Sequence, residues 1–361
     1  MGRIIKFGLI GCGNVAKKHT ESIKRIENAR IEAVCDIDEK KAKEYGKQYG
    51  VPWYISAHKM IENEDIDLIS ILTPSGTHAQ IAIDLTKYKK HLVIEKPLAL
   101  RLEDADSVIE ECDKANVKIF VVQQNRFNPP IRKLKEYINN NRFGKLVLGT
   151  VRVRWCRTQE YYDQKKWRGT WAWDGGVFAN QASHHIDMLI WMMGEVESVT
   201  AMTTTRLVKI ETEDTGAAIL RFKNGALGIV EATTATRPKD LEGSISILGE
   251  FGSVEIGGFF MNEIKVWNFK NKSHKDVEIL AKYSKNPDIY AWNHTEFLKD
   301  VVDCILKNKK GLIDGLEARK SLELINALYE SAETGQEVHL RFKPKRCKLG
   351  VKNNEKFQDF S

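Results

Sequence analysis

The chain has 361 residues, of which 42% are hydrophobic and 29% charged, a composition typical of a folded globular protein rather than a disordered one. Residues 341–361 carry +5 of the net charge of +7, so the rest of the chain is close to neutral. We therefore expect a solvated basic tail and no nucleic-acid partner. The apolar runs fall far short of the about 20 residues that span a bilayer, so no membrane partner is expected either.

The cysteines are scattered along the chain without a CxxC pair, which predicts reduced thiols and neither a disulfide framework nor a metal site. The first residues lead into an apolar strand rather than a secretory signal, and together these features favour a cytoplasmic protein. The length favours two domains over one core. We place them at residues 1–125 and 126–340, followed by the tail at 341–361.

The first predicted strand, residues 4–10, ends in the sequence GCGNVA, where a helix begins. This GxGxxA pattern is typical of a dinucleotide-binding turn. Gly11 permits the tight turn, Gly13 lets the backbone approach a pyrophosphate, and the small last residue lets helix and strand pack closely. The residues expected to meet a cofactor here are Gly11, Gly13, Asn14 and Val15.

A second apolar strand, residues 31–35, ends in Asp36, about 20 residues after the turn. A carboxylate at this point accepts hydrogen bonds from both ribose hydroxyls of NAD and repels the 2′-phosphate of NADP. The alternative is a capping or turn residue ahead of the charged helix expected at 39–49. We favour cofactor binding, with NAD as the cofactor.

Strands and helices continue to alternate up to about residue 125. Apolar strands are expected at 66–72, 91–95 and 118–122, with helices after residue 78 and at 102–115. Short turns between them predict parallel βαβ units, and thus a doubly wound Rossmann sheet. The segments that then share one edge of this sheet are 11–16, 36, 73–78, 95–97 and 123–126.

The strand at 91–95 leads into the residues that we expect to perform chemistry. Pro97 cannot donate to a sheet ladder, so the strand stops before it. Glu95 and Lys96 then lie at the carboxyl end of a strand, where ligands bind in open α/β sheets. An exposed salt-bridging pair is the alternative, but the glycine turn at the same edge favours a site.

After about residue 125 the pattern changes to a helix at 129–142 and strands of alternating polarity. Asn224-Gly225 predicts a two-residue type I′ hairpin turn. The alternation predicts an α+β domain with a mostly antiparallel meander, one side packed and one open. The expected strands are 145–157, 198–207, 214–223, 226–235, 243–248, 253–257 and 263–268, with helices near 289–308 and 314–334.

A helical stretch before Gly194 carries a polar stripe. At about 100° per residue, Asn180, His184 and Asp187 fall on one narrow face. His184 has three interpretations: a structural histidine, a metal ligand with Asn180 or Asp187, or a general acid/base. With a dinucleotide domain before it, we favour the acid/base role.

The motifs GLIGCGNVAKKH, TPSGTH, EKPLA, QNRF and GGVFANQASHHID, with Asp36, follow one another from residue 3 to about residue 335. In this order and spacing the chain resembles the glucose–fructose oxidoreductase/inositol dehydrogenase family of two-domain NAD(P) enzymes. The resemblance implies a Rossmann domain and an open sheet that joins copies into a homodimer or homotetramer. It also implies that Lys96 and His184 meet the substrate beside the nicotinamide, and that the Lys96–Pro97 bond is cis. By the same resemblance, the cofactor is approached by Thr73, Pro74, Thr77, His78, Glu95, Lys96, Gln124, Trp167 and Arg168.

Asn180 and Ala182 depart from the commonest family pattern, which has Asp and Gly at these positions. Asn cannot take a proton, so the resemblance does not extend to a carboxylate relay at residue 180. This variant, with Tyr161-Tyr162-Asp and Trp167-Arg-Gly-Thr-Trp171 upstream, resembles the subgroup that oxidises UDP-N-acetylglucosaminuronic acid at C3. The resulting 3-keto sugar feeds an aminotransferase in the synthesis of surface polysaccharide.

Such a nucleotide-sugar substrate carries a carboxylate and a diphosphate, which need cationic partners. The candidates are Arg126, Arg168, Arg152 and Arg154. Tyr161, Tyr162 and Trp167 offer rings that stack on sugar or base, and anchoring of loops over the sheet is the alternative for each of them.

The predicted reaction is NAD-dependent oxidation of a secondary hydroxyl of the sugar. His184 takes the hydroxyl proton, Lys96 stabilises the charge that develops on the oxygen, and Asn180 orients His184 or the sugar. Lys96 is an alternative base, because burial lowers its pKa while Glu95 raises it. The rival functions are another sugar or polyol dehydrogenase, such as one for inositol, and a non-catalytic NAD(H)-binding regulator.

Overall fold

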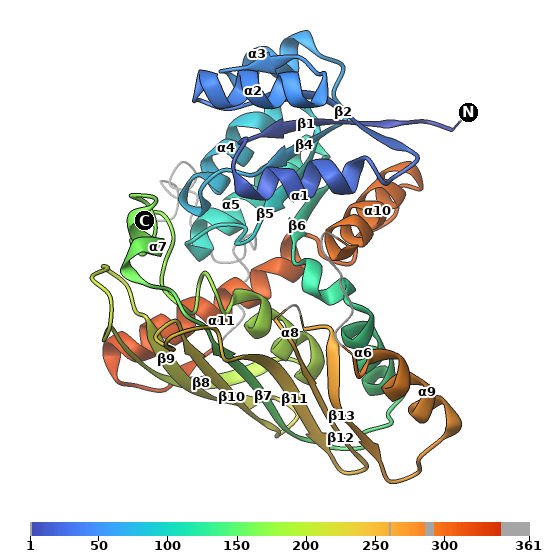
Figure 1. Cartoon of the computed structure of the whole chain (residues 1–361), viewed down its shortest axis with the longest axis vertical. Coiled ribbons are helices and arrows are strands. Elements are labelled where there is room, and N and C mark those ends of the chain that lie inside the picture. The colour runs from blue at the N-terminus through green and yellow to red at the C-terminus, as the bar shows by residue number, and fades with distance from the viewer. Residues whose placement is uncertain (1, 260, 286–291, 341–361) are drawn as a thin grey trace, which may run out of the picture.

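The computed structural model describes residues 2–259, 261–285 and 292–340. The predicted tail at 341–361 and the first residues of the helix predicted near 289 lie outside this part of the chain. Two sheets organise the structure, one in an N-terminal unit and one beneath it, with helices between them (Figure 1).

The N-terminal sheet is parallel and six-stranded, in the order β3-β2-β1-β4-β5-β6. This is the doubly wound Rossmann order that the alternating pattern predicts, and the strand order reverses between β1 and β4. β4 and β6 are buried along their whole length, which explains their continuous apolar sequences. The strands are β1 (Ile5–Ile10), β2 (Ala29–Cys35), β3 (Trp53–Tyr54), β4 (Leu68–Ile71), β5 (His91–Glu95) and β6 (Ile119–Val122).

Helices follow these strands at the predicted places, and local signals set their ends. For example, α2 begins after Asp38, whose side chain accepts a hydrogen bond from the backbone of Lys41, and stops at Gly50 with φ of +68°. Sequence reasoning missed β3 and α3, which are short. The helices and 3₁₀ turns of this unit are α1 (Asn14–Ile23), α2 (Glu39–Tyr49), α3 (Ala57–Asn63), η1 (Ser75–Thr77), α4 (His78–Leu85), η2 (Thr86–Tyr88), α5 (Leu102–Ala115) and η3 (Gln124–Phe127).

The second sheet has eight strands in the order β13-β12-β11-β7-β10-β9-β8-β14. It is mostly antiparallel, as predicted, but it is no simple meander, because β7 lies between β10 and β11 and pairs with β10 in parallel. The strands are β7 (Leu146–Arg154), β8 (Val196–Thr204), β9 (Thr215–Phe222), β10 (Leu227–Thr233), β11 (Glu242–Gly249), β12 (Gly252–Gly257), β13 (Glu263–Phe269) and β14 (Val338–His339).

The hairpin between β9 and β10 is present, but the predicted turn type is wrong. Gly225 has φ of +86°, whereas Asn224 does not adopt the positive φ that a type I′ turn also requires. The Asn224 side chain is instead fixed by contacts with the carbonyl of Met193 at 2.9 Å and the amide of Ala226 at 3.0 Å.

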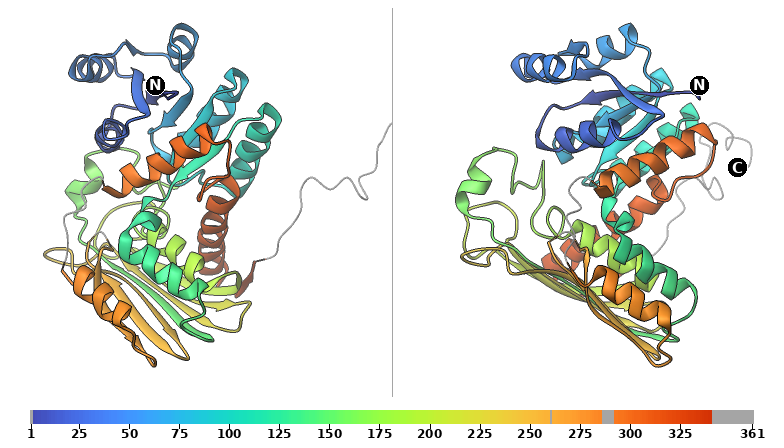
Figure 2. Two further views of the ribbon diagram at one scale, coloured as in Figure 1. Left: turned by 90° about the vertical axis from the view of Figure 1, so that its right-hand side faces the viewer. Right: turned by 45° about the vertical axis from the view of Figure 1, so that its right-hand side comes forward.

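Helices cover one face of the second sheet and leave the other open (Figure 2). They are α6 (Pro129–Asn139), α8 (Ser183–Met193), α9 (His274–Tyr283) and α11 (Gly315–Thr334), with the short α7 (Gln159–Asp163) in a loop at one end. Along β9, Ala218 and Leu220 are buried while Ile219 is exposed, which is the alternation of a one-sided sheet. Within the described ranges, no helix is both long and apolar enough to cross a membrane.

The C-terminal helices connect the two units. α10 (Trp292–Leu306) packs beside α1, and its Phe297 and Leu298 belong to the N-terminal core (Figure 1). In α11, Leu322 joins the same core, while Leu328 joins the core of the second sheet. The C-terminal helices therefore contribute to the core of the N-terminal unit, and the domain boundary at residue 125 stays a prediction.

Candidate active site

The glycine turn after β1 is shaped for a pyrophosphate. Gly11 has φ of +100°, and a Cβ there would lie 2.8 Å from the carbonyl oxygen of Leu72, so only glycine fits. A Cβ on Gly13 would point into open space, with no protein atom within 4 Å. Because α1 begins at Asn14, its unpaired amides face that space. The turn thus fits the diphosphate of a dinucleotide.

Asp36 lies beside this turn, at the end of β2. One of its carboxylate oxygens accepts a hydrogen bond from the backbone of Cys12 at 2.8 Å, and the other accepts from the backbone of Asp38 at 2.9 Å. The helix cap of α2 is Asp38, so Asp36 is not the cap, although its bond to the Asp38 amide also makes it a turn residue. Its carboxylate is fixed next to the glycine turn, where a ribose acceptor belongs.

The segment after β4 lies at the same edge. The hydroxyls of Thr73 and Thr77 are 2.7 Å apart, and Thr77 also donates to the carbonyl of Pro74. His78, which was predicted to approach the cofactor, is buried, and its ring nitrogens lie 2.8 Å from the carbonyl oxygens of Thr73 and Pro97. Because both nitrogens are occupied by protein, we correct that prediction: His78 joins the loops that follow β4 and β5.

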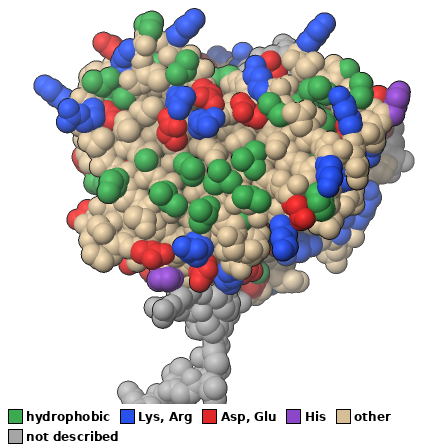
Figure 3. Space-filling model, turned by 90° about the horizontal axis from the view of Figure 1, so that it is seen from below, with side chains coloured by type: hydrophobic (Ala, Val, Ile, Leu, Met, Phe, Trp, Pro, Cys, Tyr) green, Lys and Arg blue, Asp and Glu red, His purple; other side chains and the backbone are tan. Residues whose placement is uncertain are grey.

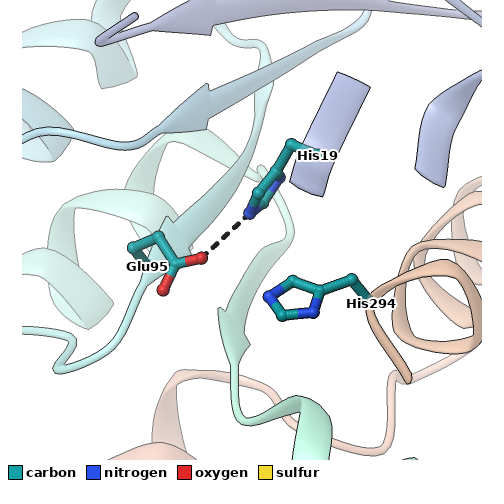
Figure 4. A group of neighbouring side chains, drawn as sticks. All are labelled: His19, Glu95 and His294. Carbon is teal, nitrogen blue, oxygen red and sulfur yellow. Dashed lines mark hydrogen bonds and ion pairs between the residues drawn. The ribbon is translucent and has the colours of Figure 1, made fainter. Parts of the chain in front are cut away.

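Glu95 ends β5 in a buried cluster (Figure 4). His19 of α1 lies 2.9 Å from its Oε1, and the ring of His294 from α10 meets the His19 ring edge-on at 5.9 Å. Burial favours a raised pKa for the Glu95 carboxyl, but the His19 hydrogen bond and the nearby positive charges outweigh it and lower the pKa to about 2. Glu95 is therefore a buried anion held by His19 and not the exposed salt-bridge partner of Lys96.

His19 and His294 were not singled out from the sequence, although His19 ends the GLIGCGNVAKKH motif. The donor atoms of His19, Glu95 and His294 lie within 4.8 Å of one another, and two imidazoles with a carboxylate are a donor set that zinc accepts. His19 and Glu95 already satisfy each other through their hydrogen bond. That the protein needs no metal stays a prediction.

Lys96 points toward the second unit. Its Nζ donates to the backbone oxygen of Asn180 at 2.8 Å and lies 3.4 Å from the side-chain oxygen of the same residue. Burial lowers the pKa of the Lys96 ammonium, and the charges of Glu95 and Asp174 offset part of this effect. The Lys96–Pro97 bond is cis, as the resemblance implies.

His184 faces the same small cavity as Lys96. The amide nitrogen of Gln124 lies 3.2 Å from His184 Nε2 and holds the ring. Burial, assisted by the positive charge of Lys96, keeps the pKa of His184 well below its usual value, so the imidazole is neutral at pH 7. The structure thus brings together Lys96, Gln124, Asn180 and His184 from three segments, after β5, in η3 and at the start of α8.

The predicted polar stripe is wrong, because α8 begins at Ser183 and Asn180 belongs to the turns before it. The amide of Asn180 makes a single helix-like bond to Gly176, but the amide of Ala182 bonds to Val177, five residues back, so the turns before Ser183 do not continue the repeat of α8. His184 and Asp187, three residues apart in α8, both face η3, where Asp187 is buried and receives two hydrogen bonds of 2.7 Å from Arg126.

Arg126 is therefore not a substrate ligand in this structure. It is 1% exposed, and its Nη1 donates to Glu317 of α11 at 2.9 Å. A guanidinium that is buried and paired with two carboxylates is not accessible to a diphosphate. Arg152 and Arg154 are also paired, both with Glu231 and Glu242 on the open face of the sheet.

The loop at 157–176 contains the remaining residues that were predicted to bind the cofactor or the substrate. Arg168 is half-buried, stacks on the Tyr161 ring at 3.9 Å and donates to the Tyr161 carbonyl at 2.6 Å. Tyr162 is 5% exposed and contacts Thr234 through its hydroxyl at 3.1 Å, so the loop-anchor alternative is correct for it and the predicted substrate contact is not. Trp167 is half-buried.

Trp173, which sequence reasoning did not place in the site, connects this loop to the edge of the first sheet where the cofactor is expected. Its carbonyl accepts a hydrogen bond of 3.0 Å from the backbone of Gly76, and a Cβ on Gly76 would lie 2.5 Å from the carbonyl of Ala172. The two loops therefore touch backbone to backbone across the site.

Comparison with known proteins agrees with this geometry. Residues 5–123 match the model of the NAD-binding Rossmann fold of the Gfo/Idh/MocA oxidoreductase family, and residues 135–340 match its C-terminal alpha/beta domain. The chain belongs to this oxidoreductase family. It is an NAD-dependent dehydrogenase acting on a CH–OH group, and NAD is its cofactor.

Individual relatives are more specific. Crystal structures of WlbA dehydrogenases in complex with NADH and UDP-GlcNAcA match most of this chain. The Bordetella pertussis enzyme is 39% identical, with a TM-score of 0.90, over 94% of this chain and 99% of its own. The Chromobacterium violaceum enzyme is 40% identical, with a TM-score of 0.89, over 95% and 98%. Myo-inositol 2-dehydrogenase of Thermotoga maritima is 33% identical over 63% of this chain and 68% of its own.

Proposed function

We propose that this protein oxidises the C3 hydroxyl of UDP-N-acetylglucosaminuronic acid to the 3-keto sugar, in a nucleotide-sugar route to surface polysaccharide. The observation that carries the proposal is the identity of 39–40% over 94–95% of the chain with two dehydrogenases crystallised with NADH and UDP-GlcNAcA. NAD⁺ supplies the hydride acceptor when it is bound.

Lys96 and His184 have different roles at the reacting hydroxyl. An ammonium group has three donors; in Lys96 two of them face the oxygens of Asn180, which leaves one for the sugar oxygen. That hydrogen bond stabilises the negative charge that develops as the proton leaves. Asn180 can accept from Lys96 but cannot carry a proton onward.

The proton then needs a base other than Lys96 in its ammonium form. His184 is neutral, because burial keeps its pKa low, and it lies close enough to Lys96 for the ammonium charge to lower that pKa further. We therefore assign the general base to His184, whose Nε2 accepts the proton when the sugar hydroxyl takes the place of the Gln124 amide there, and the oxygen-stabilising role to Lys96. Lys96 becomes the base only if the lowering of its pKa leaves it neutral at the working pH.

The proposed cofactor contacts lie along the edge of the first sheet, which the predicted segments share. The residues proposed to line it are Gly11, Gly13, Asn14, Val15, Asp36, Thr73, Pro74, Thr77, Glu95, Lys96, Gln124, Trp167 and Arg168. Of the predicted substrate cations, Arg168 remains, because its partners are a carbonyl and an amide oxygen rather than a carboxylate. It is the residue that we expect to meet the uronate or diphosphate.

The open face of the second sheet supports a homodimer or homotetramer. Figure 3 shows hydrophobic side chains gathered on this face. The strand registers put five exposed ones on the same side, which we call the open-face patch: Met202, Ile219, Leu227, Ile229 and Leu248. An apolar patch of this kind on a soluble protein is typical of a protein interface. Cytoplasmic location is part of the proposal, and the free thiols of the described cysteines support it.

The second candidate is a polyol dehydrogenase, which the similarity to myo-inositol 2-dehydrogenase favours. The test supplies NAD⁺ with UDP-N-acetylglucosaminuronate, myo-inositol or glucose and follows the absorbance of the reduced cofactor. Bound cofactor is also extracted and its redox state measured, because tightly held NADH would hide turnover. We expect reduction with the nucleotide sugar alone. Reduction by inositol but not by the nucleotide sugar overturns the proposal, and no reduction by any of them favours the non-catalytic regulator.

A further inference from the structure

We propose that Asp174 is the buried carboxylate that positions Lys96 for catalysis, acting through the amide of Asn180. This inference rests on the proposed function and deepens it, because Asp174 supplies the negative charge that Asn180 lacks. Asp174 lies in the loop before α8 and is 2% exposed.

The hydrogen bonds form a directed chain. One oxygen of Asp174 accepts from the backbone of Gly169 at 2.8 Å, and the other accepts from the side-chain nitrogen of Asn180. A carboxylate only accepts, so it selects the NH₂ end of the amide. The oxygen of that amide is thereby turned toward the Nζ of Lys96, at 3.4 Å.

Without Asp174, only the 3.4 Å contact with Lys96 Nζ distinguishes the two ends of the Asn180 amide. If the amide were reversed, its NH₂ group would meet the ammonium, two donors face to face, and Lys96 would lose an acceptor. The third donor of Lys96 would then no longer be directed at the sugar oxygen. Asp174 is therefore a positioning residue, one step removed from the reacting atoms.

Asp174 also acts on Lys96 through its charge. The charged groups that face Lys96 are Glu95 on β5, Lys18 on α1 and Asp174 itself, with the neutral His184 across the cavity. Of these, Asp174 and Glu95 raise the pKa of Lys96 against the effect of burial. Removing the Asp174 charge lowers the pKa of Lys96, so the ammonium is lost at a lower pH.

The test compares Asp174→Asn with the exchange variant Asp174→Asn/Asn180→Asp, which returns a carboxylate to the pair and places it next to Lys96. Asp174→Asn is expected to lose about tenfold or more in kcat, with the alkaline limb of its pH profile moved to lower pH. The exchange variant is expected to recover most of the activity. Its alkaline limb is expected at the same pH as in the wild type or at a higher pH. Glu211→Gln is the matched control, because Glu211 binds the backbone of Trp171 in the same loop at 3.0 Å without facing Lys96.

A substrate-independent readout separates this inference from the proposed function. The rate at which an amine reagent labels Lys96, measured by mass spectrometry against pH, reports the titration of Lys96 even if the substrate assignment is wrong. We expect the midpoint to fall in Asp174→Asn and to rise in the exchange variant, while the melting temperature and NAD binding report folding. An unchanged midpoint in both variants, or lost activity with no shift of the alkaline limb, overturns the proposal.

Discussion

The role of Lys96 in the reaction depends on the residues that surround it. It is a buried cation whose two fixed acceptors both belong to Asn180, and the neutral His184 shares its cavity. A cation in this position stabilises negative charge on a substrate oxygen only while it remains protonated, and a histidine removes a proton only while it remains neutral.

Replacing Lys96 with Met keeps most of the side-chain volume and removes the ammonium. We expect kcat to fall by at least about 10²-fold, the scale of a positioned acid or base, while NAD still binds. Single-turnover kinetics and titration of NAD measure the two effects. Lys114→Met, on the exposed side of α5, is the control. Turnover within about tenfold of wild type, roughly 1.4 kcal/mol of barrier, contradicts the assignment.

The two pKa shifts predict the shape of the pH profile. His184 has a pKa lowered well below 6.5, so activity is present above that pKa and disappears only as the pH falls through it. Lys96 has a pKa lowered from 10.5, so activity disappears as the pH rises through a value below 10.5. Measurement of kcat/KM against pH tests both limbs. An acid limb centred at or above 6.5, or one that persists in His184→Gln, speaks against His184 as the base.

At the scale of elements, a buried ion-pair cluster sets the position of the helix that carries His184. Arg126 in η3 joins Asp187 of α8 and Glu317 of α11, and it stacks against Trp191 at 5.0 Å. Gln124, which holds His184, lies in the same 3₁₀ turn as Arg126. The cluster therefore fixes the turn and the helix relative to each other.

Arg126→Met leaves the carboxylate of Asp187 buried without its partner. We expect the free energy of unfolding to fall by about 3–5 kcal/mol, the cost of breaking a buried pair, as measured by urea denaturation. Lys307→Met breaks the exposed pair with Asp303 and is expected to cost less than about 1 kcal/mol. Equal effects in the two variants would show that the buried cluster is not what holds α8.

Elements with strong local signals could be predicted from the sequence. The glycine turn, Asp36, α2 and α5 follow from apolar periodicity, caps and turn residues close together in the chain. The partners of Arg126 could not be predicted, because Asp187 and Glu317 lie 61 and 191 residues away, and sequence alone does not reveal which charges become buried together. Asn180 was misplaced on a helix because the turns at 176–182 lead directly into α8 and include one helix-like bond, from Asn180 to Gly176.

At the scale of the whole molecule, the active site forms because the C-terminal helices pack back against the N-terminal unit. The cofactor edge belongs to the first sheet, whereas Asn180 and His184 come from segments that pack on the second. α11 crosses between the units, with Leu322 in one core and Leu328 in the other, and so fixes their separation. Figure 2 shows that the open face of the second sheet lies on the side away from this junction. Assembly through that face therefore leaves the site accessible.

Ile219 lies on β9, within the open-face patch, and is 62% exposed in the single chain. Ile219→Lys puts a charge into the proposed interface and is expected to lower the oligomeric order. Light scattering after size-exclusion chromatography gives the mass. Val277→Lys, at a 49% exposed position on α9, is the control. A wild-type protein that runs as a monomer, or an Ile219→Lys variant that keeps the wild-type mass, contradicts assembly through this face.

Transfer of an isotope from C3 of the uronate to the nicotinamide is the sharpest test of the proposed hydride transfer. The protein is incubated with NAD⁺ and UDP-N-acetylglucosaminuronate deuterated at C3, and the extracted cofactor is analysed by mass spectrometry. We expect reduced cofactor that carries the deuterium, together with a keto group at C3 of the sugar. Reduced cofactor without deuterium, or a deuterated sugar recovered unchanged while unlabelled inositol reduces the cofactor, would contradict it.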